Sequence, residues 1–89
     1  MKLKYDFYVS DFAKEKVAIV VGDGLGKYDS YIRLDATAAE IFDMLKSHVT
    51  RQEIADRLSI ENPDEDPAEI QNIVDDFLER LKGAHLLEE

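Results

Sequence analysis

The chain has 89 residues, of which 45% are hydrophobic, and a formal net charge of −9 at pH 7. This length provides one modest hydrophobic core, so we expect a single domain over residues 1–89. The absence of cysteine excludes a disulfide framework, and the wide separation of the two histidines, His48 and His85, argues against a zinc site.

The first third of the chain predicts three short strands. Residues 5–12 alternate apolar and polar side chains, and residues 16–21 form a β-branched run too short for a helix. Residues 28–34 alternate less cleanly, with Ile32 and Leu34 on one face and Tyr31 and Arg33 on the other.

The periodicity changes to that of helices after Leu34. Asp35 is a predicted N-cap, Thr50 and Glu53 have the spacing of a capping box, Asp66 precedes a proline, and Gly83 has the place of a C-terminal cap. Helices are therefore expected over about residues 36–47, 51–59 and 67–82. The order predicts an α+β, winged helix-turn-helix-like fold in which a three-stranded antiparallel sheet is followed by three helices.

Three alternating glycines in "VVGDGLGKYD" suggest a phosphate-binding loop, but the context does not fit one. A Walker loop and a dinucleotide fingerprint both open a helix, whereas Gly22, Gly24 and Gly26 lie between two predicted strands with the wrong spacing. We interpret all three as positive-φ positions of a flexible hairpin loop, and Asp23 as favouring the turn.

The sequence shows no catalytic motif. Adjacent carboxylates such as Asp75 and Asp76 point in different directions on a helix, and no serine or threonine has a histidine at motif spacing. We expect no enzymatic activity, no cofactor and no metal. Asp6 and Asp11 interrupt the apolar N-terminal stretch, which excludes a signal peptide, and no segment has membrane-spanning length, so we expect a soluble cytoplasmic protein.

The ordered elements "YIRLDATAAEIFDML", "TRQEIADRL" and "VDDFLERLKGAHLL" resemble the coenzyme PQQ synthesis protein D family, also called RiPP recognition elements. RiPPs are ribosomally made, post-translationally modified peptides. The resemblance covers nearly the whole chain and is most specific between Leu34 and Leu87. It implies a non-catalytic, chaperone-like domain that holds the leader of a precursor peptide and presents it to a modifying enzyme, frequently a radical SAM protein.

The resemblance also implies where the leader binds. In the family it pairs with the third strand and lies against the third helix, and strand addition to a sheet edge is a known mode of peptide recognition. Carried across by position, the expected peptide-binding residues are Tyr28, Asp29, Ser30, Tyr31, Ile32, Arg33, Leu34, Ile73, Phe77 and Arg80.

Two points about the third helix stay open in the sequence. Ile73 and Leu78 lie at opposite borders of its apolar stripe, so either border could face the peptide, whereas Phe77 fits the core or the floor of a groove. The acidic positions Asp75 and Glu79, with Asp76, could attract a basic leader, although we favour a role in keeping the protein soluble.

Two other functions remain as alternatives. A winged-helix DNA-binding regulator has the same element order, but residues 61–89 carry ten Asp and Glu against two Lys and Arg, which opposes binding to phosphates. We therefore expect no nucleic-acid partner and no membrane partner. A generic interaction module, or a homodimer formed through the strand edge, is the other alternative.

Overall fold

The computed structural model describes residues 1–12, 15–22 and 31–88, and the rest of this account concerns those residues. The elements, in chain order, are β1 (Lys2–Leu3), β2 (Asp6–Phe12), β3 (Glu15–Val21), β4 (Tyr31–Leu34), α1 (Ala36–Met44), α2 (Arg51–Glu61), α3 (Pro67–Gly83) and β5 (Leu87–Glu88). None of these helices is long and apolar enough to cross a membrane.

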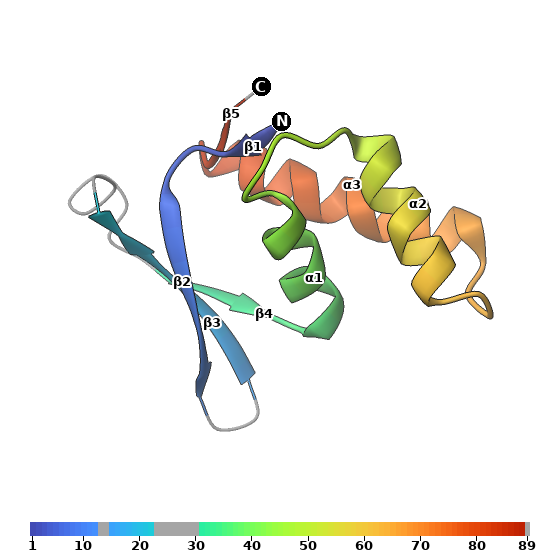
Figure 1. The fold of residues 1–89 in the computed structure, drawn as a ribbon, viewed down its shortest axis with the longest axis horizontal. Coiled ribbons are helices and arrows are strands. Elements are labelled where there is room, and N and C mark those ends of the chain that lie inside the picture. Colours follow the sequence, from blue (N-terminus) through green and yellow to red (C-terminus); the bar gives the residue numbers. More distant parts are fainter. Residues whose placement is uncertain (13–14, 23–30, 89) are drawn as a thin grey trace.

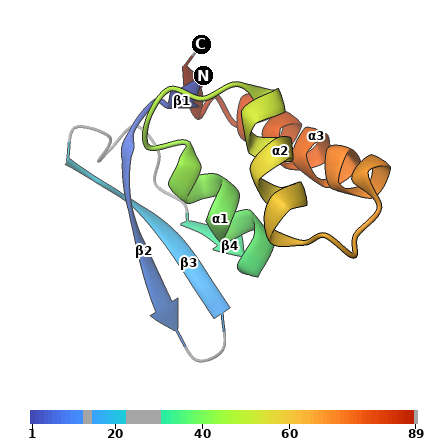
Figure 2. The same cartoon turned by 45° about the vertical axis from the view of Figure 1, so that its right-hand side comes forward.

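The main sheet is antiparallel with strand order β2-β3-β4. Its register places Tyr8 opposite Ile19, and Ile19 opposite Tyr31. The three helices follow this sheet in the chain and lie to one side of it (Figures 1 and 2). The α+β fold class expected from the sequence is confirmed.

A second, two-stranded sheet pairs β1 with β5 and brings the two ends of the chain side by side (Figure 1). The sequence did not predict this pair, because two-residue strands have no periodicity. Its neighbourhood also ends α1 at Met44, earlier than the predicted residue 47. The Leu3 N–H donates to the Leu45 carbonyl, and the Val49 N–H donates to the Met1 carbonyl, so Leu45 and Val49 hold the segment after α1 against the N-terminal segment.

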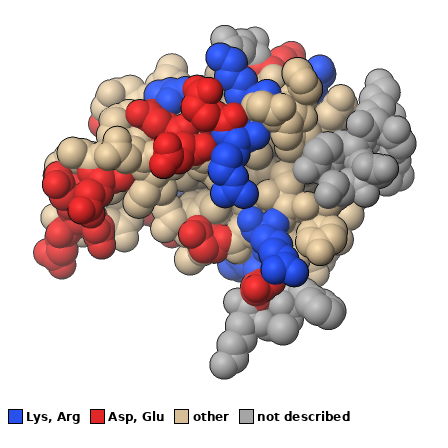
Figure 3. Space-filling view, turned by 180° about the vertical axis from the view of Figure 1, so that it is seen from behind, with Lys and Arg blue, Asp and Glu red and all other residues tan. Residues whose placement is uncertain are grey.

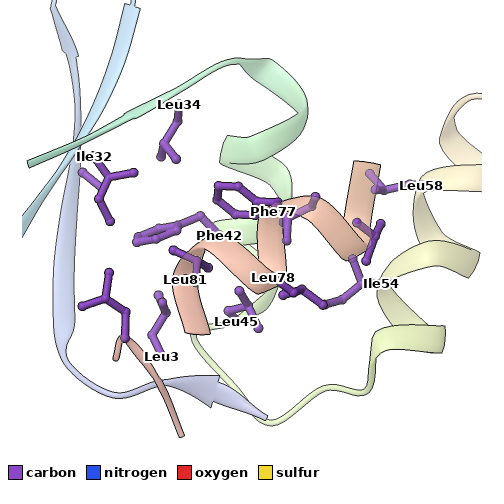
Figure 4. Packing of buried hydrophobic residues seen from close by; sticks show 14 of the residues in the cluster. Leu3, Ile32, Leu34, Phe42, Leu45, Ile54, Leu58, Phe77, Leu78 and Leu81 are labelled. Atoms are coloured by element: carbon purple, nitrogen blue, oxygen red, sulfur yellow. The ribbon is translucent and has the colours of Figure 1, made fainter. Parts of the chain in front are cut away.

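The core lies between the main sheet and α3, with α1 at its centre (Figure 4). Ile41, Phe42 and Leu45 of α1 are completely buried. The Phe7 ring of β2 meets the Phe42 ring edge-on, with centroids 5.0 Å apart, and so ties the sheet to the helices.

The end of α3 differs from the predicted glycine cap. Ala84 is the C-cap, and His85 has the left-handed backbone, with φ of 60°. The Leu86 N–H donates to the Leu81 carbonyl and the His85 N–H to the Lys82 carbonyl, which is a Schellman motif with histidine at its left-handed position. The motif directs Leu86 into the core, where it is buried. Among the loop glycines, Gly22 has φ of 66°, whereas Gly24 and Gly26 lie outside the described residues.

Candidate functional site

β4 is an edge strand of the main sheet. Among the described strands it pairs only with β3, so the N–H and C=O groups along its other side have no strand partner. Ile32 and Leu34 point into the core, whereas Tyr31, which is 56% exposed, and Arg33 point to the outer surface of the sheet. The predicted binding residues Tyr28, Asp29 and Ser30 lie outside the described part of the chain.

The two borders of the α3 stripe have different surroundings. Leu78 is 1% exposed and lies beside Ile54 of α2 in Figure 4. On the same side of the helix, the Arg51 guanidinium of α2 lies 2.6 Å from the Asp75 carboxylate and 3.5 Å from that of Glu79. This side of α3 is therefore covered by α2.

The opposite border of α3 is open. Ile73 is 49% exposed, and Arg80 lies two turns along the same border, about 10 Å away at the rise of an α-helix. Because α2 covers the side that carries Leu78, Ile73 belongs to the border that is free to meet another molecule. Of the two border residues, Ile73 is exposed and Leu78 is buried, and a peptide contact at Ile73 stays a prediction.

The core side chains relate this border of α3 to β4. Figure 4 shows Phe77 and Leu81 of α3 entering the same core as Ile32 and Leu34 of β4, with the Phe42 ring between Leu81 and Ile32. In Figure 1, α3 begins on the side of the molecule where β4 ends and runs back toward the side where β4 begins. Phe77 itself is 5% exposed, so it acts as a core residue beneath this surface rather than an open contact.

A hollow of about 140 Å³ lies between the first turn of α1, the end of α2 and the start of α3. Its walls include Thr37 of α1, Leu58 of α2, and Ile70 and Ile73 of α3, while Asn62 and Glu65 contribute polar groups. Thr37 and Ile70 were not singled out from the sequence. The helical spacing of Ile70 and Ile73 was visible, but the approach of Thr37 depends on tertiary packing. We use the term β4–α3 face for the free edge of Tyr31–Leu34, this hollow, Ile73 and Arg80.

The charges near the β4–α3 face differ from those of the rest of the helical layer. Figure 3, viewed from the side opposite to Figure 1, shows a band of Lys and Arg down the middle, with Asp and Glu gathered on the helical side. Arg80 forms no salt bridge with any described residue, and Arg33 lies 3.7 Å from Glu15. Asp75 and Glu79 face α2, and their hydrogen bonds with Arg51 raise the pKa of its guanidinium. They are therefore not positioned to attract a peptide at β4.

The chain was compared with protein families, curated proteins and solved structures. Residues 20–87 match the family described as Coenzyme PQQ synthesis protein D. Neither the curated proteins nor the solved structures give a match. The matched range includes β4, all three helices and every described residue of the β4–α3 face.

Proposed function

Because this chain belongs to the coenzyme PQQ synthesis protein D family, a family of peptide-recognition proteins, we propose that it binds the leader of a ribosomally made precursor peptide as an added strand on β4. It then presents the peptide to a modifying enzyme, of which a radical SAM protein is the expected kind. The chain itself supplies binding and orientation rather than chemistry.

One observation carries the proposal: β4 has an edge without a strand partner, and Ile73 and Arg80 are exposed on the border of α3 opposite the one that packs on α2. An extended peptide on that edge makes main-chain hydrogen bonds with β4, which provide affinity with little dependence on sequence. Its side chains alternate between two environments, because successive residues of a strand point to opposite faces. One set meets Ile73 and the hollow beside Thr37, and the other set lies next to Tyr31 and Arg33.

These environments indicate the kind of leader that binds. Ile73 and Ile70 favour an aliphatic side chain in the hollow beside Thr37. The unpaired Arg80 favours a carboxylate about two helical turns from that position. We therefore expect a leader segment with an aliphatic anchor and an acidic residue, rather than the basic leader that the acidic composition of α3 suggests.

The proposal is tested by titrating the labelled full chain with a synthetic leader taken from a short reading frame encoded beside it. We expect saturable shifts at residues 31–34, 37, 73 and 80. Replacing Ile73 with Asp should weaken binding at least about tenfold, because it places a charge at an apolar contact. Ile60→Asp is the matched control, since Ile60 is an exposed isoleucine of α2.

Three results would overturn the proposal. They are the absence of saturable binding, shifts confined to other surfaces, and equal effects of the two isoleucine variants. Salt-sensitive binding to duplex DNA with no binding to the leader would support the winged-helix regulator instead. The acidic tip of α3 argues against that outcome, since Asp64, Glu65, Asp66 and Glu69 are all exposed there.

A further inference from the structure

A second surface with the features of a binding site lies between α1 and α2. A hollow of about 560 Å³ is lined by Met44 of α1, Val49 of the connecting loop and Ile60 of α2. Ile60 is 79% exposed, the highest value among the large hydrophobic residues that are described as exposed. A single exposed aliphatic residue is ordinary, but here it stands beside a hollow that two half-buried apolar side chains also line.

The rim of this hollow is acidic. Glu53, Asp56 and Glu61 line it, and Glu40 and Asp43 line an adjoining hollow that shares Met44, Arg57 and Glu61. The two cations nearby are already paired, since Arg57 lies 3.4 Å from Glu61 and Lys46 lies 3.1 Å from Asp43. These two cations pair with Glu61 and Asp43 only, so the five carboxylates keep an excess of negative charge at the rim.

Glu40 shows the effect of this crowding. A hydrogen bond with Glu61 is the largest cause that raises the pKa of Glu40, followed by partial desolvation and by repulsion from the Glu61 charge. Arg57 opposes the rise, but not enough to cancel it. Glu40 forms no salt bridge with a described residue, so a cation brought from outside would find an unmatched carboxylate here.

The acidic rim decides between possible occupants. A second copy of this chain would bring another acidic surface and another net charge of −9, so self-association through this surface is opposed. A helix that carries aliphatic residues on one side and Lys or Arg along its flanks matches both the hollow and the rim. Helix-in-groove recognition of this kind uses apolar anchors at i, i+3 or i+4, and i+7.

From this arrangement we infer that the α1–α2 surface, defined by Met44, Val49, Ile60 and the carboxylates of Glu40, Glu53 and Glu61, docks a basic amphipathic helix of a partner protein. The surface is formed by α1 and α2, which face the viewer in Figure 1, whereas α3 lies behind them. None of its lining residues lines the hollow of the β4–α3 face, so the chain can hold a leader and a partner protein together. The inference does not depend on leader binding.

The test uses two synthetic helical peptides of about four turns, one with Leu on one side and Lys on the flanks, the other with Glu in place of Lys. Each is titrated into the labelled full chain at physiological salt. We expect saturable shifts over residues 44–61 with the Leu/Lys peptide and none with the Leu/Glu peptide. Ile60→Ala should weaken binding about fivefold or more, whereas Ile73→Ala, which does not line this hollow, should leave binding unchanged.

A second pair of variants separates specific docking from general attraction to an acidic protein. Glu40→Gln with Glu61→Gln removes two carboxylates from the rim, and Asp64→Asn with Glu65→Gln removes two from the α2–α3 loop. The inference expects the first pair alone to weaken binding severalfold. Equal losses from both pairs, shifts at residues 31–34 and 73–80, or insensitivity to Ile60→Ala would overturn it. Leader titration of the same variants is a separate readout, so failure of leader binding would leave this result unaffected.

Discussion

His85 has an unusual backbone conformation for its residue type. Its φ of 60° lies in the left-handed region, where a side chain with a Cβ costs about 1–2 kcal/mol relative to glycine. The two hydrogen bonds of the Schellman motif and the burial of Leu86 hold the residue there. Gly83, two residues earlier, lies within the helix and does not have a positive φ, so it is not the left-handed residue of the cap.

We expect His85→Gly to stabilise the protein by about 1 kcal/mol, because it removes the left-handed strain while keeping both hydrogen bonds. The greater freedom of glycine in the unfolded chain offsets part of the gain. The measurement is the midpoint of urea unfolding. Ala84→Gly is the control, since Ala84 has φ of −89° and has no such strain to lose. A lower midpoint for His85→Gly would show that the imidazole makes a stabilising contact.

At the scale of single elements, α2 depends strongly on its N-terminal cap. The helix buries only Ile54, Ala55 and Leu58 among its residues. The Thr50 hydroxyl accepts from the Glu53 N–H at 3.0 Å, and the Glu53 carboxylate accepts from the Thr50 N–H at 3.0 Å. This confirms the capping box that the sequence predicts, and it positions the helix that covers one border of α3.

Replacing Thr50 with Ala should destabilise the protein by about 1 kcal/mol, because the Glu53 N–H loses the hydroxyl that accepts its hydrogen bond. Thr50→Ser should retain most of the stability, since serine keeps the hydroxyl. Both variants are compared by urea unfolding at one pH. If Thr50→Ala and Thr50→Ser behave alike, the capping box does not contribute as described.

The sequence predicts much of each element and little of how the elements meet. Caps at Asp35, Thr50 and Asp66 are visible locally, because each is a side chain that bonds to a backbone N–H two or three residues onward. The β1–β5 pair and the open border of α3 depend on contacts between distant segments. That Leu78 is buried and Ile73 is exposed depends on where α2 packs, and the periodicity of α3 does not predict that position.

At the scale of the whole molecule, basic and acidic side chains gather on different parts of the surface. On the side of the molecule seen in Figure 3, Lys and Arg form a band down the middle, while most carboxylates lie on the helical side. The two proposed surfaces have opposite requirements, an acidic, extended leader at β4 and a basic helix at α1–α2. This division allows the two ligands to be distinguished by charge as well as by shape.

The central claim is that a peptide becomes a strand on β4, and amide hydrogen exchange tests it most directly. With saturating leader, we expect slowed exchange at alternate residues of Tyr31–Leu34, namely those whose N–H groups are not bonded to β3. The seven residues of β2, the other edge of the main sheet, should exchange as in the free chain. Slowed exchange along β2, or unchanged exchange throughout β4 while the leader is bound, would contradict this account.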